Sequence, residues 1–91
     1  MMSKFEVRFS DKGWKKLQRL GRTDVKRVIK KVAVLREYPS VSGDVKKMSG
    51  TKLKLYRLRI GDIRAIFEVD GTSGIVWIIG VDYRGRVYRG W

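Results

Sequence analysis

The alternation of hydrophobic and polar positions divides the chain into two halves with different periods. Residues 4–9 alternate polar and apolar side chains, a pattern that predicts a half-buried strand. Between residues 11 and 38 the apolar positions recur every three or four residues, which predicts two amphipathic helices. Gly21 separates these helices, and Pro39 ends the second because proline disfavours a helical residue before it. The first half is therefore a strand followed by a helical hairpin.

The second half has the two-residue period of strands. Residues 40–52 are rich in Ser, Gly and Lys and predict a loop. Residues 53–60 predict a strand that turns tightly at Gly61-Asp62 into another strand over 63–69. Residues 75–81 are apolar throughout, which predicts a strand buried on both faces. The predicted order is β-α-α-β-β-β, an α+β fold in which a three-stranded antiparallel meander follows the N-terminal strand and helical hairpin within a single domain of residues 1–91.

Charge and composition narrow the class of protein. The 91 residues carry 22 basic and 9 acidic side chains, and a net charge of +13 favours a polyanionic partner. The absence of cysteine and histidine excludes disulfides, thiolate metal sites and the commonest general base. No apolar run resembles a signal peptide or reaches membrane-spanning length. We therefore expect a cytoplasmic protein with no membrane partner.

The basic residues change type along the chain. All eleven lysines lie before residue 55, and the six basic residues that follow are all arginines. Lysine is a strongly hydrated point charge, whereas arginine offers a planar fork of donors that matches a phosphate in two-point contact. The second half therefore predicts a built phosphate site.

Three of these arginines are predicted to meet on the face of the sheet that the helices leave open. The two-residue period puts Arg57 and Arg59 on one side of their strand, and the tight turn brings Arg64 beside them. Arg84, just past the last strand, is expected to reach the same face. The alternative is that these arginines are ordinary solvated residues paired with carboxylates, although carboxylates are few in this half of the chain.

Two stretches carry a family resemblance. They are Leu55-Tyr-Arg-Leu-Arg-Ile-Gly-Asp-Ile-Arg64, within a longer match over residues 47–69, and the tail Val81-Asp-Tyr-Arg-Gly-Arg-Val-Tyr88. Together with the order of elements, they resemble the RelE/ParE superfamily of toxins from type II toxin–antitoxin pairs, and most closely its archaeal RelE-like members. The resemblance covers the whole domain and implies a RelE-like fold.

The resemblance also implies an activity and a set of site residues. RelE-like toxins are metal-independent endoribonucleases that cut messenger RNA in the ribosomal A site, and no cofactor is implied. Their functional positions are two basic residues on the second strand, an arginine on the third, an arginine after the last strand and a tyrosine near the C-terminus. In this sequence those positions are Arg57, Arg59, Arg64, Arg84 and Tyr88.

Arginine at the first two positions, where bacterial members commonly have lysine, limits the chemistry. Arginine stays protonated at neutral pH, so neither Arg57 nor Arg59 can act as a general base. Tyr88 remains as the candidate base, since nearby arginines lower the pKa of a phenol from about 10. We expect Tyr88 to take the proton of a ribose 2′-hydroxyl, whose oxygen then attacks the adjacent phosphate. Arg64 and Arg84 are expected to stabilise the charge that develops there.

Other residues are expected to contact RNA without a chemical role. Tyr83 is flanked by arginine and is a candidate for stacking on a base, whereas Tyr56 and Trp77 lie within apolar strands and are predicted to be core residues. The expected RNA-binding set is Lys52, Lys54, Tyr83, Arg86 and Arg89.

Partners follow from the same resemblance. It implies a cognate RelB-like antitoxin, of acidic character to complement the net charge of +13, together with the ribosome and messenger RNA. The toxin alone is expected to be monomeric. Two other functions stay open: inhibition of DNA gyrase in the manner of ParE-like members, and binding to RNA or the ribosome without catalysis.

Overall fold

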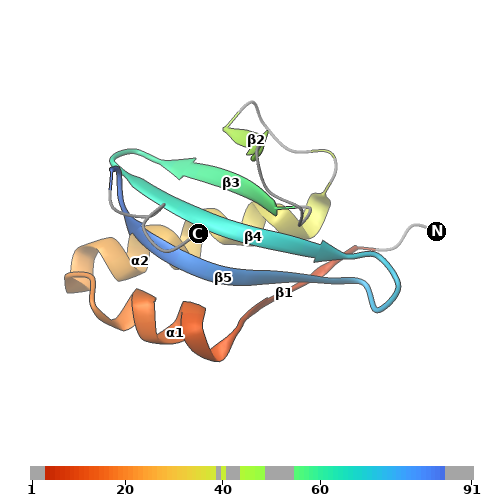
Figure 1. Cartoon of the computed structure of the whole chain (residues 1–91), viewed down its shortest axis with the longest axis horizontal. Coiled ribbons are helices and arrows are strands. Elements are labelled where there is room, and N and C mark those ends of the chain that lie inside the picture. The colour runs from red at the N-terminus through yellow and green to blue at the C-terminus, as the bar shows by residue number, and fades with distance from the viewer. Residues whose placement is uncertain (1–3, 39, 41–43, 49–54, 86–91) are drawn as a thin grey trace.

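The computed structural model describes residues 4–38, 40, 44–48 and 55–85 of the chain (Figure 1). Two α-helices and a 3-10 helix, η1, follow the first strand and precede the remaining four. The elements are β1 (Glu6–Phe9), α1 (Asp11–Gln18), α2 (Arg22–Val32), η1 (Ala33–Glu37), β2 (Val45–Lys47), β3 (Leu55–Ile60), β4 (Ile63–Asp70) and β5 (Ile75–Tyr83). No helix within these described ranges is long and apolar enough to cross a membrane.

The strands form one sheet in the order β1-β5-β4-β3-β2. The four later strands pair antiparallel with their neighbours, while β1 runs parallel to β5 at the opposite edge. The β4–β5 register shifts between Ile66 and Phe67, where β5 carries one extra residue. The first strand of the chain therefore lies beside the last, and the meander lies in between.

Both helices cover the same face of the sheet (Figure 1). α1 packs against β5 and β1, and α2 packs against β3. Ser10 begins α1 by accepting a hydrogen bond from the backbone N–H of Gly13 at 3.0 Å. At Gly13 the helix approaches β5 so closely that a side-chain methyl group would collide with the carbonyl oxygen of Ile78. Glycine is therefore what allows α1 to lie against this strand.

The main core fills the space between the helices and the sheet. Its fully buried side chains include Leu17, Val28, Leu35, Leu58, Phe67 and Ile78. A second, smaller cluster lies on the opposite side of the sheet, which we call the outer face. There Leu55 and Ile66 are buried, with Met48 and Ile79 packed against them. The outer face is thus partly apolar although neither helix covers it.

The predicted α+β order is confirmed, with two corrections. Residues 45–47 form β2, an edge strand paired with β3, where we predicted only loop. Its three residues include a single apolar side chain, which is too little to show a two-residue period. Residues 75–81 were expected to be buried on both faces, but Trp77 is only half-buried and lies on the outer face opposite Glu68. The prediction that Trp77 is a core residue is therefore wrong.

The equivalent prediction for Tyr56 is confirmed. Tyr56 lies half-buried against the main core, and its ring stacks on that of Phe67 with centroids 5.4 Å apart. A hydrogen bond to Tyr56, together with burial, raises the pKa of the neighbouring Tyr38 to about 12.

Candidate functional site

Three arginines lie together on the outer face, where β3 and β4 approach their connecting turn. Arg59 is directly opposite Arg64 in the antiparallel register, and Arg57 is opposite Ile66. Directly opposed residues point to the same side of a sheet, with Cβ atoms about 5 Å apart. The structure thus places Arg57, Arg59 and Arg64 on one face, as the two-residue period predicts.

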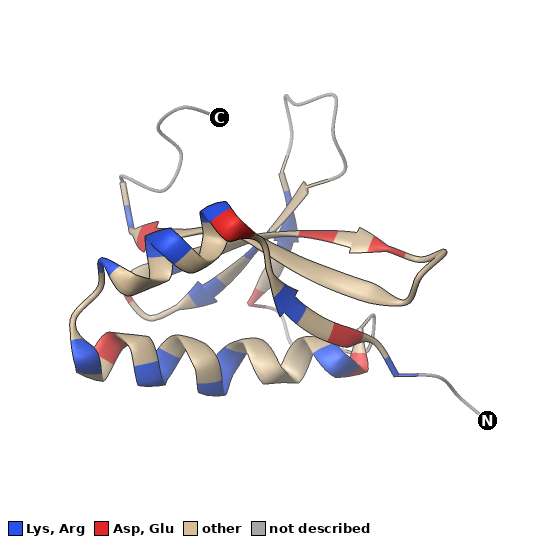
Figure 2. Cartoon of the chain, turned by 90° about the horizontal axis from the view of Figure 1, so that it is seen from below, with Lys and Arg blue, Asp and Glu red and all other residues tan. Residues whose placement is uncertain are grey.

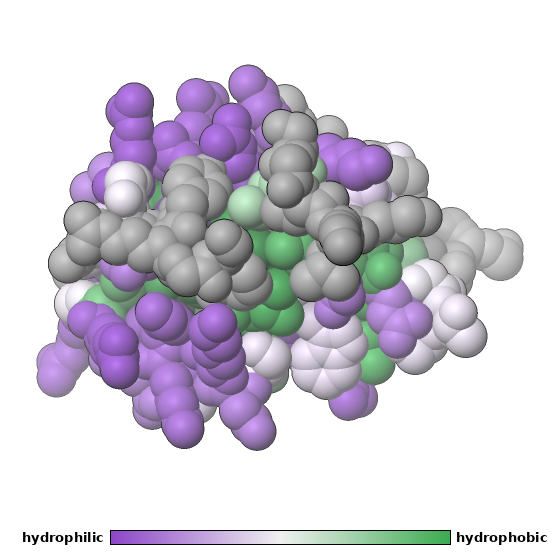
Figure 3. Space-filling model, in the orientation of Figure 1, coloured by the Kyte–Doolittle hydropathy of each residue, from purple (hydrophilic) through white to green (hydrophobic). Residues whose placement is uncertain are grey.

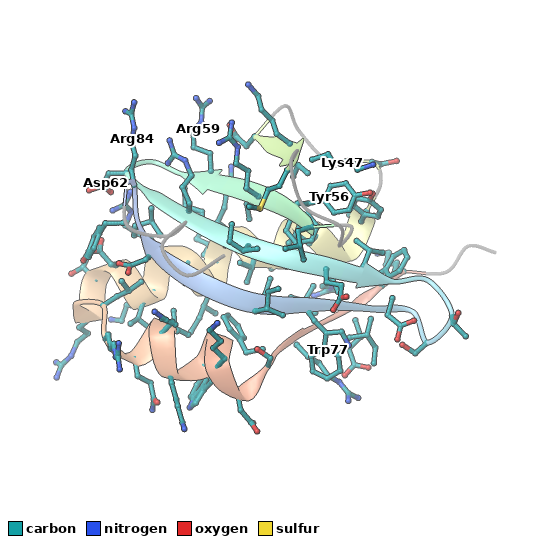
Figure 4. All side chains as sticks on the ribbon, in the orientation of Figure 1. Lys47, Tyr56, Arg59, Asp62, Trp77 and Arg84 are labelled. Carbon is teal, nitrogen blue, oxygen red and sulfur yellow. The ribbon has the colours of Figure 1, made fainter. Side chains whose placement is uncertain are left out.

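The β3–β4 turn joins Arg64 and Arg84 to this group. Gly61 has a φ of 62°, the left-handed conformation that glycine adopts readily and that allows the tight turn. Nη1 of Arg64 donates to the carbonyl oxygen of Gly61 at 2.7 Å. The backbone N–H of Arg84 donates to the carbonyl oxygen of Asp62 at 2.7 Å, which fixes Arg84 beside the turn. Figure 4 shows its guanidinium extending from the sheet in the same direction as that of Arg59.

Two carboxylates enter this basic group, and one of them, Asp82, lies directly opposite Arg64 in the β4–β5 register. Asp44, immediately before β2, accepts a hydrogen bond from Nζ of Lys31 at 3.0 Å and from Nη2 of Arg59 at 2.9 Å. These two cations, Lys31 foremost, hold the pKa of Asp44 below its usual range. The alternative that the arginines are paired with carboxylates therefore applies in part to Arg59. Arg57, Arg59, Arg64 and Arg84 still outnumber Asp44 and Asp82, so the local charge remains positive.

Lys46 is a member of this group that the sequence analysis did not identify. It lies on β2 directly opposite Arg57, so its side chain is on the outer face, and it is exposed. Residues 40–52 were predicted as loop, and a loop gives no basis for assigning Lys46 to a face. The one sequence feature that could have placed Lys46 is the apolar residue before it, Val45. Val45 lies opposite the buried Leu58, so the next residue, Lys46, points to the outer face.

Tyr83 is separated from the arginines by the sheet. Its register partner is Ile63, which is buried on the helical side, and its hydroxyl donates to Oδ2 of Asp24 in α2 at 2.6 Å. This hydrogen bond raises the pKa of Tyr83 and lowers that of Asp24. The structure therefore does not bring Tyr83 to the outer face, where we expected it to stack on RNA.

The remaining predicted residues cannot be placed in the site. Tyr88, Lys52, Lys54, Arg86 and Arg89 lie outside the described residues. Within the described part of the chain, no group of three acidic residues is arranged to hold a metal ion.

Positive charge also extends beyond this site. Figure 2 shows Lys and Arg along the exposed sides of both helices, with few acidic residues between them. On the outer face, Figure 3 shows an apolar strip with hydrophilic side chains on either side. The helical cations can supply sequence-independent attraction to a polyanion, whereas the arginines of the outer face form a localised group at one end of the sheet.

A five-stranded sheet of this topology with two helices on one face is the fold of RelE toxins. A family profile described as "ParE toxin of type II toxin-antitoxin system, parDE" matches residues 7–88. The chain belongs to this family of type II toxin–antitoxin toxins. No curated protein matches it significantly.

Solved structures show the same fold. The chain is 30% identical to one in the archaeal RelE–RelB complex from Pyrococcus horikoshii OT3, covering 91% of this chain and 98% of that one with a TM-score of 0.73. The RelBE2 toxin–antitoxin complex from Mycobacterium tuberculosis gives 22% identity, 92% and 95% coverage and a TM-score of 0.78. The isolated E. coli RelE toxin gives 21% identity, 90% and 86% coverage and a TM-score of 0.72.

Proposed function

We propose that this toxin is a ribosome-dependent endoribonuclease that cuts messenger RNA and so inhibits translation. The observation that supports this most directly is the position of Arg57, Arg59 and Arg64 on adjacent strands of the outer face, with Arg84 fixed beside the same turn. Guanidinium groups gathered from separate segments suit a phosphate that gains charge during reaction. The similarity to archaeal RelE supports the same reading.

The proposed reaction moves two protons, forms one P–O bond and breaks another. Tyr88, activated by Arg57 and Arg59, removes the proton of a ribose 2′-hydroxyl. The 2′-oxygen attacks the adjacent phosphorus, and the bond to the 5′-oxygen of the next nucleotide breaks. The leaving 5′-oxygen takes up a proton from solvent, so the products are a 2′,3′-cyclic phosphate and a 5′-hydroxyl. Arg64 and Arg84 stabilise the pentacovalent phosphate.

An acidic, RelB-like antitoxin is the proposed regulatory partner. The similar structures from P. horikoshii and M. tuberculosis are both toxin–antitoxin complexes. A net charge of +13 favours an acidic protein that approaches the basic outer face and competes with RNA for it.

Cleavage of message on programmed ribosomes tests the proposal. Arg64→Ala is expected to lower the cleavage rate by about 100- to 1,000-fold, the usual effect of removing one transition-state donor. Arg36→Ala is the matched control, because Arg36 is an exposed arginine of η1 on the helical side and forms no ion pair within the described part of the chain. The control should cleave at the wild-type rate, and both variants should keep the wild-type unfolding temperature.

The other two functions have different signatures. A ParE-like toxin would inhibit DNA supercoiling by gyrase and leave the message intact. A binding protein without catalysis would protect ribosome-bound message, and Arg64→Ala would only weaken its affinity. An intact message with the wild-type protein would refute the nuclease assignment.

A further inference from the structure

A recess opens beside the N-terminal end of α1, on the side of the sheet that carries Trp77. It has a volume of about 440 Å³ and combines aromatic, aliphatic and acidic walls. Its lining residues are Phe9, Ser10, Asp11, Glu68, Trp77 and Ile79. Figure 4 shows Trp77 on the part of β5 away from Arg84, so the recess is separate from the arginines at the turn.

The recess is lined by two acidic residues that have no hydrogen-bond or ion-pair partner among the described residues. Seven of the nine carboxylates in the chain accept a hydrogen bond or form an ion pair within the described residues. The other two, Asp11 and Glu68, form neither within that part of the chain, and both are exposed. Asp11 lies in the first turn of α1, where a carboxylate is favourable, whereas Glu68 on β4 has no such role and no partner within the described residues.

The chemistry of these walls specifies a ligand. An ionised carboxylate only accepts hydrogen bonds, and its two oxygens suit two adjacent N–H donors. An indole ring offers a flat face on which an unpaired base can stack. Guanine is the base whose Watson–Crick edge presents an adjacent ring N–H and exocyclic amino group, whereas uracil presents one N–H between two carbonyl oxygens. A basic peptide fits the carboxylates as well, but a net charge of +13 repels it and attracts RNA.

We propose that this recess binds an unpaired guanine base of the RNA, with the ring stacked on Trp77 and its Watson–Crick edge bonded to Glu68. Register supports this, because Glu68 and Trp77 are direct cross-strand neighbours on the outer face. The guanidinium of Arg8, also paired with Glu6, lies over one face of the Trp77 ring, 6.0 Å from its centre, so the base would stack on the opposite face. Arg8 also supplies positive charge beside the recess.

The recess and the arginines can be occupied by one RNA strand. Arg64 and Glu68 lie on the same side of β4, four residues apart, a separation of about 13 Å along a strand. A short single strand can therefore place a phosphate at the arginines and a nearby guanine in the recess. The inference rests on the proposed function in taking RNA as the ligand, and it adds a preference for guanine near the cut.

Binding of short 2′-O-methyl oligonucleotides tests the recess without cleavage, because their blocked 2′-oxygen cannot attack. Three uridine-rich oligonucleotides would differ at one position, which is guanine, hypoxanthine or uracil. Hypoxanthine keeps the ring N–H of guanine and lacks its exocyclic amino group. The wild-type protein is expected to bind the guanine oligonucleotide roughly 5- to 100-fold more tightly than the uracil one, the discrimination of a bidentate contact. Hypoxanthine should fall between them.

Two variants and one control separate recognition of the base from general electrostatic attraction. Glu68→Gln should abolish the guanine preference, while affinity for the uracil oligonucleotide stays equal or rises because a negative charge is removed. Trp77→Leu should weaken binding of all three through lost stacking. Glu37→Gln removes the same charge from η1, on the helical side, and should keep the guanine preference.

The proposal is overturned if wild type binds the guanine and uracil oligonucleotides equally, or if Glu68→Gln keeps the preference. It is also overturned if an arginine-containing peptide binds in a Glu68-dependent manner while RNA shows no base preference. Parallel cleavage assays distinguish this failure from that of the nuclease assignment. A guanine preference without cleavage retains the recess as an RNA subsite, and cleavage without the preference retains only the nuclease.

Discussion

Replacing Gly13 with alanine is expected to destabilise the protein by about 2 kcal/mol, although alanine is the better helix former. By helix propensity alone, glycine to alanine inside a helix stabilises by about 1 kcal/mol. At Gly13, however, the new methyl group would collide with the carbonyl oxygen of Ile78 on β5. A backbone atom in the middle of a sheet has no rotamer through which to move away, so α1 must shift off β5.

The magnitude follows from setting the two effects against each other. Overpacking costs about 1–3 kcal/mol, and the rigid contact at Ile78 favours the upper end of that range. Subtracting the gain in helix propensity leaves about 2 kcal/mol. For a domain of this size, each kcal/mol lowers the midpoint of thermal unfolding by about 4–8 °C, so a decrease of roughly 8–16 °C is expected. Thermal unfolding followed by circular dichroism measures it directly.

Gly21→Ala is the matched control. Gly21 precedes α2 with a φ of −66°, which alanine adopts without strain, and nothing lies within 4 Å of the position that a methyl group would occupy. Its unfolding free energy should stay within about 0.5 kcal/mol of wild type. If Gly13→Ala unfolds at or above the wild-type temperature, close packing of α1 on β5 does not limit stability. The reasoning about Gly13 would then be wrong.

Three further outcomes concern charge. The pKa of Asp44 is lowered in the folded state, so its stabilising effect is present above its ordinary pKa of about 4 and is lost as pH falls through the folded value. The difference in unfolding temperature between wild type and Asp44→Asn should therefore shrink on acidification below about pH 4, and a constant difference would contradict it. Conversely, the pKa of Tyr38 is raised to about 12 in the folded protein. Its stabilising effect is therefore present below the ordinary phenol pKa of about 10 and is lost as pH rises toward 12. In the folded protein, the phenolate absorbance of Tyr38 should appear near pH 12 rather than near pH 10. Finally, if Arg57 contacts a phosphate, Arg57→Ala should reduce the slope of log affinity against log salt for single-stranded RNA by about 0.7, and an unchanged slope would exclude that contact.

Periodicity in the sequence was sufficient for most of the fold. The switch from a three-to-four-residue period to a two-residue period places the helices and the later strands, because each buries one face and exposes the other. The same alternation assigns Arg57 and Arg59 to the face opposite Leu58. β2 was not predicted, since three residues with one apolar side chain are held in the sheet by pairing with β3 rather than by their own pattern.

The site was predicted less completely, for reasons that involve long-range contacts. Asp44 contacts Arg59 across fifteen residues of sequence, and Tyr83 reaches Asp24 across fifty-nine. No local pattern encodes either pair, because each depends on how a loop or helix packs on the sheet. Trp77 was misassigned for a related reason. An apolar strand can have one face toward the helices and the other toward solvent, and only packing shows which side the indole occupies.

The chain alone determined the order of elements, the surplus of positive charge and the arginines that share a strand face, because these follow from residue type and spacing. The tertiary structure alone decided that Lys46 joins those arginines, that Tyr83 lies on the helical side, and that Asp11 and Glu68 line the same recess as Trp77. The physical reason is that each of these placements depends on strand register or on the packing of a helix against the sheet. Both arise only when segments distant in sequence come together.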